Sequence, residues 1–192
     1  MKKIALFGGT FDPVHLGHLV TAEDIRKNLK LDKVIFIPAG RPPHKSEADV
    51  TNAEHRLKML ELAVKPFPKF EISDYELKKS GKSYTIDTVR YFKKILNKGD
   101  KLYFIAGSDI VRQIKLWKEW EKLIKEVHLL IMARPGFKAG KKASEFGSLI
   151  EIKNIDISSS AIRKTIKKGL PVTYMVPETV EKYIYEHKLY GS

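Results

Sequence analysis

The stretch "IALFGGTFDPVHLGH" (residues 4–18) decides the fold, because a short apolar run that is typical of a buried strand ends in a glycine-rich turn. Gly8 and Gly9 carry no side chains, so the backbone there can approach a ligand closely and point its N–H groups at an anion. Two glycines after a strand can also form a tight turn and nothing more. The stretch therefore predicts a first strand that ends in either a plain turn or a phosphate site.

The residues after this turn favour the phosphate site. Pro13 fixes the backbone and has no N–H to donate, so we expect a helix to begin just after it. His15, Gly17 and His18 would then lie in the first helical turn, with both imidazoles on one face at the positive end of the helix dipole. A His-x-x-His pair can also be part of a zinc site, but zinc requires further ligands. The remaining histidines form no second spaced pair: His44, His55, His128 and His187.

The rest of the chain alternates short apolar, β-branched runs with segments of helical period. This alternation predicts an α/β fold, namely a Rossmann-like, doubly wound, mostly parallel sheet with helices on both faces. We expect strands at residues 3–7, 33–37, 70–73, 102–106, 127–132 and 149–152. We expect helices at residues 16–29, 53–64, 85–96, 120–125, 158–168 and 177–187, and a loop without a core role at 139–148. Ligands of such sheets bind beyond the carboxyl ends of the strands, which is where the glycine turn lies.

Length and composition narrow the class of protein. A chain of 192 residues with 43% hydrophobic residues can bury a substantial core, and we expect residues 1–192 to form a single domain with a helical C-terminal part from about residue 157. No apolar run is long enough to span a membrane, and the basic start is not followed by the apolar segment of a signal peptide. The absence of cysteine excludes disulfides, thiolate catalysis and sulfur-bound zinc. It also agrees with a cytoplasmic location, which we predict.

A formal net charge of +13 points to an anionic partner. The 36 Lys and Arg residues are scattered along the chain instead of forming one basic arm, and solvated lysine-rich helix faces account for such a count. We therefore predict small phosphorylated substrates, and no nucleic acid, as partners. The sequence leaves the oligomeric state open, a homo-oligomer included.

A second motif, "ISSSAIR" (residues 157–163), also has the chemistry to bind phosphate. Its three serines supply a hydroxyl N-cap and helix N-terminal amides, and Arg163 lies one turn later on the same face. The motif thus offers several donors and a fixed positive charge. By itself it would indicate an ordinary capped helix with an exposed arginine.

Taken together, the two motifs resemble the signatures of the nucleotidyltransferase superfamily, in which a glycine-containing turn and an HxGH pair bind the phosphates of ATP. The segments "SYTIDT" (83–88), "AGSD" (106–109) and "ARPG" (133–136), with Trp117, extend the resemblance over nearly the whole chain, to the bacterial nicotinate-nucleotide adenylyltransferases. The resemblance implies an enzyme of NAD biosynthesis that transfers AMP from ATP to nicotinate mononucleotide and releases pyrophosphate. The alternatives are a phosphopantetheine or a nicotinamide-mononucleotide adenylyltransferase.

The resemblance also implies roles for individual residues. His15, His18 and Arg163 are expected to be catalytic, with His18 nearest the charge that develops on the bridging oxygen of ATP. The residues expected to bind ATP are Gly8, Gly9, Thr10, Phe11, Lys45, Gly107, Asp109, Arg134, Ser158 and Ser159. The residues expected to bind nicotinate mononucleotide are Tyr84, Thr85 and Trp117, because a flat ring with a carboxylate requires an aromatic face and anion-binding donors. Without the resemblance, these three would be interpreted as a half-buried core residue and a capped turn.

The expected chemistry is simple, since the nucleophile is already a phosphate monoester anion. We expect direct in-line attack on the α-phosphorus without a covalent intermediate, so that catalysis rests on positioning and charge stabilisation. Mg²⁺ is the expected cofactor, held mainly by phosphate oxygens. Lys118 stands where several members of the family carry an aromatic residue, and it either faces solvent or adds positive charge near the substrate carboxylate. A non-catalytic nucleotide sensor and an RNA-binding module are the alternatives from other classes of protein.

Overall fold

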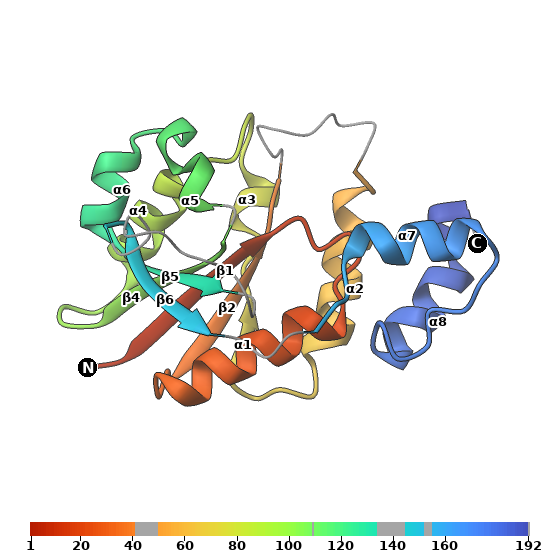
Figure 1. Ribbon diagram of the computed structural model, residues 1–192. Helices are drawn as coiled ribbons and strands as arrows, with labels where there is room; N and C mark the ends of the chain where they lie inside the picture. The colour runs from red at the N-terminus through yellow and green to blue at the C-terminus, as the bar shows by residue number, and fades with distance from the viewer. Residues whose placement is uncertain (41–49, 109, 134–144, 152–154, 192) are drawn as a thin grey trace.

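The computed structural model describes residues 1–40, 50–108, 110–133, 145–151 and 155–191. Its sheet has six strands in the order β3-β2-β1-β4-β5-β6, and every neighbouring pair is parallel. The strands are β1 (Lys3–Gly9), β2 (Lys33–Pro38), β3 (Phe70–Ile72), β4 (Lys101–Gly107), β5 (His128–Ala133) and β6 (Gly147–Glu151). The chain builds one half of the sheet outward from β1, returns to β4 beside β1, and builds the other half in the opposite direction (Figure 1). The carboxyl ends of β1 and β4 therefore border the crevice at which doubly wound sheets bind ligands.

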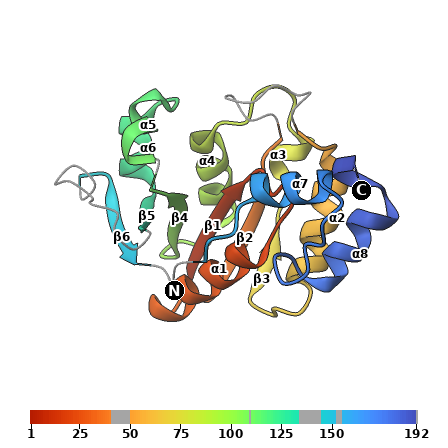
Figure 2. The ribbon, with the colours of Figure 1, turned by 45° about the vertical axis from the view of Figure 1, so that its right-hand side comes forward.

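Helices cover both faces of this sheet (Figure 2). They are α1 (Leu16–Asn28), α2 (Ala53–Val64), α3 (Tyr75–Lys78), α4 (Thr85–Ile95), α5 (Ile110–Gln113), α6 (Trp120–Glu126), α7 (Ser159–Lys167) and α8 (Glu178–Glu186), with the 3-10 turns η2 (Ile114–Leu116) and η4 (Leu189–Gly191). Alternate residues of β1 belong to two hydrophobic clusters. Ala5 and Phe7 pack with α1, α2, α7 and α8, whereas Ile4 and Leu6 pack with α4, α5 and α6. Because both faces of β1 are buried, its sequence is a continuous apolar run instead of an alternating one.

The predicted α/β fold is confirmed, and the main strands and helices begin and end within a few residues of their predicted bounds. The short helices α3 and α5 and the turn η2 were not predicted, because four residues or fewer give no helical period. The helix α1 begins at Leu16, as predicted, but His15 is its N-cap with an extended backbone and does not lie in the first helical turn.

The expected loop at residues 139–148 is wrong at its end. Phe146 is buried and packs edge-on against Trp120 with the ring centroids 6.0 Å apart, and β6 already begins at Gly147. A Cβ at Gly147 would lie only 2.3 Å from the carbonyl oxygen of Leu129, so glycine is what allows β6 to approach β5. In the sequence, a glycine that close packing requires looks the same as a glycine of a loop.

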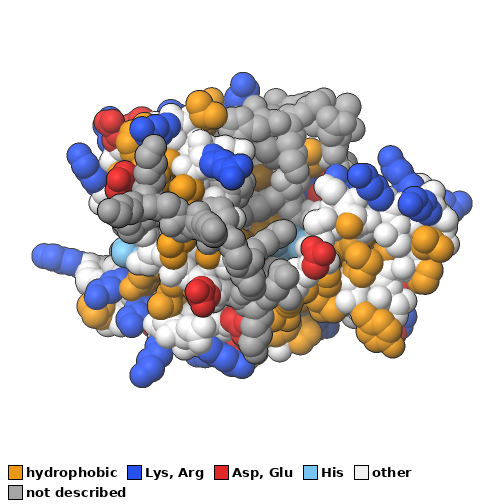
Figure 3. Space-filling model, viewed as in Figure 1, with side chains coloured by type: hydrophobic (Ala, Val, Ile, Leu, Met, Phe, Trp, Pro, Cys, Tyr) orange, Lys and Arg blue, Asp and Glu red, His pale blue; other side chains and the backbone are white. Residues whose placement is uncertain are grey.

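Two observations concern the surface and the membrane. On the face seen in Figure 3, Lys and Arg side chains are spread over separate elements and do not form one basic patch. Among the described residues, no helix has the length and apolar character needed to cross a membrane.

Candidate functional site

A cavity of about 370 Å³ opens at the crevice between β1 and β4. Gly8, Gly9 and Thr10, which end β1 and begin the following loop, line it together with Gly107 at the end of β4. The absence of side chains at these glycines leaves the backbone exposed to a ligand. The predicted glycines thus lie where the fold places a binding site.

The two predicted aromatic residues, Tyr84 and Trp117, line the same cavity. Tyr84 is the N-cap residue of α4 and Thr85 is its first helical residue, so the free N–H groups of the first turn lie at the cavity. Trp117 follows η2, is half-buried, and meets Phe104 edge-on with the ring centroids 6.4 Å apart. Trp117 therefore packs on the core and lines the cavity at once, which reconciles the two interpretations of this residue.

Lys118 also lines the cavity, and its side chain is 42% exposed. Its ammonium lies 4.7 Å from the centroid of the Tyr84 ring and 3.4 Å from the Oδ1 atom of Asp87. The other oxygen of Asp87 accepts a 2.6 Å hydrogen bond from Lys79. One carboxylate therefore serves two lysines, and this group of three side chains carries a surplus positive charge beside Tyr84.

Glu76 also lines the cavity, although it belongs to no motif that points to a binding site. This residue of the short helix α3 is buried, and its carboxylate accepts a 2.6 Å hydrogen bond from the hydroxyl of Thr88. Burial raises the pKa of Glu76, although hydrogen bonds from neighbours such as Thr88 oppose the shift. A single glutamate outside any recognised motif carries no signal by which sequence reasoning could have selected it.

His15 and His18 lie beyond Thr10 in the loop after β1 and at the start of α1. Their rings are stacked, with centroids 3.6 Å apart and an angle of 24° between the planes. The backbone N–H of His15 donates to Nδ1 of His18 at 3.2 Å, so in the neutral ring the proton of His18 resides on Nε2. Burial, together with the nearby His15, holds the pKa of His18 well below its usual value. The ring is therefore neutral at pH 7, with Nε2–H as its one donor.

The second sequence motif contacts the first. Ser158 is the N-cap of α7 and accepts from the N–H of Ala161, as predicted. The hydroxyl of Ser159 donates to the carbonyl oxygen of Pro13 at 2.9 Å, and the guanidinium of Arg163 donates to the carbonyl oxygen of Asp12 at 2.6 Å. The helix N-terminus of α7 is thereby fixed beside the loop that carries the two histidines.

Two further buried charges support the same loop and were assigned no role from the sequence. Arg56 is 1% exposed and donates to the carbonyl oxygens of Thr10 and Thr51, each at 2.9 Å. Asp12 is 3% exposed, and its carboxylate accepts from the hydroxyl of Tyr190 and from the backbone N–H of Thr51. Local spacing could not reveal these contacts, because their partners lie up to 178 positions apart in the sequence.

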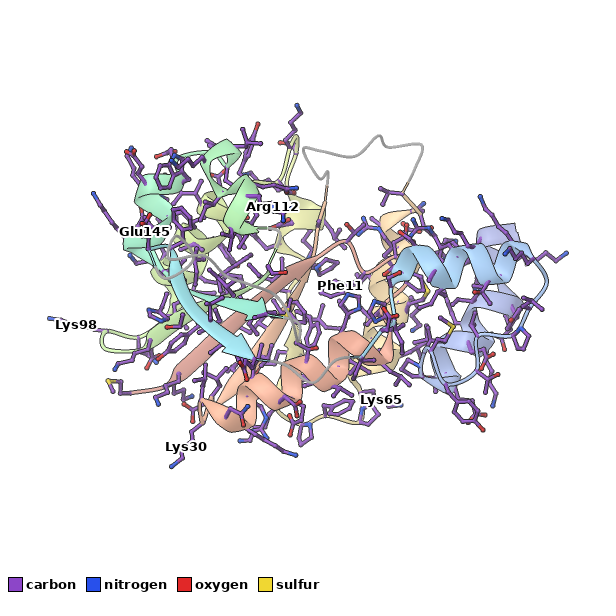
Figure 4. All side chains as sticks on the ribbon, in the orientation of Figure 1. Phe11, Lys30, Lys65, Lys98, Arg112 and Glu145 are labelled. Carbon is purple, nitrogen blue, oxygen red and sulfur yellow. The ribbon has the colours of Figure 1, made fainter. Side chains whose placement is uncertain are left out.

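The remaining predicted residues are placed as follows. Phe11, labelled in Figure 4, is buried in the core, where its ring meets Phe7 and Phe36 at centroid distances of 5.7 and 5.6 Å. Any contact of Phe11 with a ligand must therefore come from its backbone. Lys45, Asp109 and Arg134 lie outside the described residues.

The described residues also bear on metal binding. Within them, no group of three or more His, Cys, Asp or Glu side chains is arranged to hold a metal ion. The two histidines offer nitrogen ligands, whereas Mg²⁺ prefers oxygen.

Comparisons with known proteins show which family the chain belongs to. Residues 6–165 match the cytidylyltransferase-like family. The "Probable nicotinate-nucleotide adenylyltransferase" of Thermoanaerobacter sp. (strain X514) is 42% identical and the alignment covers 98% of this chain and 94% of that protein. The protein of the same name from Bacillus pumilus (strain SAFR-032) is 40% identical, with all of both chains covered.

Solved structures give the same result. The nicotinic acid mononucleotide adenylyltransferase of Plasmodium falciparum, complexed with NaAD, has a TM-score of 0.84 and 25% identity, with 99% of this chain and 98% of that chain covered. The same enzyme complexed with APC has a TM-score of 0.81. The chain thus belongs to the cytidylyltransferase-like family and, within it, to the nicotinate-nucleotide adenylyltransferases.

Proposed function

We propose that this protein transfers AMP from ATP to nicotinate mononucleotide, forming nicotinate adenine dinucleotide and pyrophosphate in NAD biosynthesis. The observation that carries the proposal is one cavity at the β1–β4 crevice. Gly8 and Gly9 line this cavity, and the loop with His15 and His18 follows them in the chain. Aromatic and cationic side chains also line it. Membership of the nicotinate-nucleotide adenylyltransferases supports the same assignment.

Gly8 and Gly9, together with His15 and His18, are assigned to the phosphates of ATP. In this proposal Nε2–H of His18 donates to the oxygen that bridges the α and β phosphates, where negative charge develops. His15, the N-cap residue of α1, is assigned to the same phosphates. Ser158, Ser159 and Arg163 are assigned to the pyrophosphate end, where the α7 N-terminus and a fixed positive charge favour an anion.

The reaction needs no covalent intermediate. A phosphate oxygen of nicotinate mononucleotide forms a bond to the α-phosphorus of ATP, and the bond from that phosphorus to the bridging oxygen breaks. The electron pair leaves with pyrophosphate. Because the nucleophile is already an anion, no residue has to remove a proton, and the protein contributes alignment and charge stabilisation.

The cavity wall is assigned to nicotinate mononucleotide. Trp117 and Tyr84 offer aromatic surface to the pyridine ring. Thr85 offers its hydroxyl and amide at the start of α4 to the ring carboxylate, near the ammonium of Lys118. Gly107 and the predicted residues Asp109 and Arg134 are assigned to the adenosine part of ATP, and Lys45 to its phosphates.

Magnesium is assigned to the substrate. The described residues provide no carboxylate cage, and Mg²⁺ in phosphoryl-transfer sites is commonly bound through substrate phosphates and water. We therefore propose that it enters as the MgATP complex.

The organisation of the chain is also part of the proposal. Residues of α7 and α8 share one hydrophobic cluster with β1, α1 and α2, which supports a single domain over residues 1–192.

The cysteine-free sequence is compatible with the reducing cytoplasm, where we place the protein.

The test is pyrophosphate release from ATP and Mg²⁺ with three acceptors in parallel: nicotinate mononucleotide, nicotinamide mononucleotide and phosphopantetheine. We expect rapid release with nicotinate mononucleotide and much slower release with the other two. Preference for either of the others would contradict the assignment of the cavity wall. ATP binding without release with any acceptor would indicate a nucleotide sensor instead.

A further inference from the structure

The loop between β1 and α1 contains a buried charge that the proposed mechanism does not use. Asp12 is 3% exposed and lies three residues before His15. Its Oδ2 atom accepts from the backbone N–H of Thr51 at 3.1 Å, and its Oδ1 atom accepts from the hydroxyl of Tyr190 at 2.7 Å. A buried carboxylate is costly unless its oxygens are hydrogen-bonded, so these two donors determine where the Asp12 side chain can lie.

Tyr190 reaches this position at some conformational cost. It lies in η4 with a backbone φ of 62°, in the left-handed region that side chains other than glycine rarely occupy. Such a residue persists where the surrounding structure holds it, and here the buried Leu189 precedes it. Burial and the adjacent carboxylate of Asp12 both raise the pKa of Tyr190, so its hydroxyl keeps the proton that it donates.

We call the loop between β1 and α1 the phosphate loop. We propose that Tyr190 is a positioning residue for this loop: its hydroxyl holds the Asp12 carboxylate and thereby fixes the backbone that carries His15 and His18. The inference rests on the proposed role of that loop. The other supports of the loop, Arg56, Ser159 and Arg163, all donate to backbone carbonyl oxygens. Tyr190 instead donates to the one buried carboxylate of the loop, which also accepts from the backbone N–H of Thr51, so the loss of Tyr190 takes away one of these two donors.

The substitution Tyr190→Phe removes this hydroxyl and keeps the ring. We expect kcat to fall about tenfold or more, because displacement of catalytic groups by about 1 Å can cost up to about a hundredfold. The KM for nicotinate mononucleotide should change by less than about twofold, since its proposed site at Tyr84 and Trp117 lies in the cavity, whose lining includes neither Asp12 nor Tyr190.

Tyr183→Phe is the matched control. Tyr183 lies in α8, and its hydroxyl is 2.9 Å from Nδ1 of His55, so the control also loses one tyrosine hydrogen bond. No contact described for Tyr183 involves the phosphate loop. We expect Tyr190→Phe to lose more thermal stability than Tyr183→Phe, because it takes a donor from a buried carboxylate, and we expect a loss of kcat only in Tyr190→Phe.

A second readout does not depend on activity. In proton NMR spectra of the ligand-free protein, Tyr190→Phe should shift the ring signals of His15 and His18, and Tyr183→Phe should shift those of His55. Equal kcat in the two variants, with unchanged His15 and His18 signals, would overturn the proposal. If the wild-type protein releases no pyrophosphate with any acceptor, the proposed function fails, and the NMR comparison still decides the role of Tyr190.

Discussion

Replacing His18 with alanine is expected to remove most of the activity and leave the protein folded. The ring accepts one backbone hydrogen bond, from His15 at 3.2 Å, and meets Phe11 edge-on at a centroid distance of 5.0 Å. Loss of the capping bond costs about 1 kcal/mol, and loss of the ring contact about another 1 kcal/mol. Domains of this size are stable by about 5–15 kcal/mol, so the variant should remain folded.

The expected effect on turnover is larger. If Nε2–H of His18 donates to the bridging oxygen in the transition state, its removal should lower kcat by about 10²- to 10³-fold, or about 3–4 kcal/mol. Pyrophosphate release at saturating ATP and nicotinate mononucleotide measures this loss, and thermal unfolding followed by circular dichroism measures stability.

Two variants separate the role of Nε2 from structural effects. His18→Asn retains an acceptor near the position of Nδ1 but lacks Nε2, so it should be more stable than His18→Ala and equally inactive. His128→Ala removes an exposed histidine that also makes one hydrogen bond, with Ser148 at the far end of the sheet, and should keep full activity. A folded His18→Ala protein with a rate within about tenfold of the wild type would refute the assignment.

Three further predictions follow from the site. Lys118→Met should raise the KM for nicotinate mononucleotide about tenfold, which is the value of one charged hydrogen bond. The same substitution at the exposed Lys115 should leave this KM unchanged, and an unchanged KM in Lys118→Met would show that Lys118 only faces solvent. Glu76→Gln should raise the melting temperature more at about pH 8 than at about pH 5, because a carboxyl whose pKa is raised on folding destabilises the fold once ionised; an equal gain at both pH values would contradict this. Because the pKa of His18 is lowered on folding, the wild type should lose more stability than His18→Asn as pH falls below about 6.5, and parallel melting curves would refute that sign.

Much of the site was predictable because it depends on local chemistry. Gly8 and Gly9 end a strand whose apolar run is continuous, so both their position and the location of the crevice follow from the sequence. Ser158 caps α7 as its hydroxyl and position suggested. Tyr84 and Thr85 also lie at the start of a helix, although no side-chain hydrogen bond caps it, and all of these residues belong to short motifs.

The parts that escaped prediction depend on contacts between distant segments. Arg56 lies within an amphipathic helix, where its position suggests an exposed charge, yet it is buried because the Thr10 and Thr51 carbonyl oxygens receive its donors. Nothing near Tyr190 in the sequence indicates that its hydroxyl meets Asp12. Gly147 permits close packing of two strands, and only the tertiary structure distinguishes that use of glycine from a turn.

The long sequence separations around the phosphate loop have a consequence for biosynthesis. Ser159 contacts Pro13 across 146 positions, and Arg163 contacts Asp12 across 151. At about 5–20 residues per second, a ribosome needs on the order of 10 s to translate the residues between them. Throughout that interval the nascent chain already contains both histidines but lacks Ser159 and Arg163, the two side chains of α7 that bind their loop. The growing polypeptide therefore cannot bind nucleotide productively until most of it has been translated. Catalytic activity thus shows that the N-terminal and C-terminal segments of the fold are in contact.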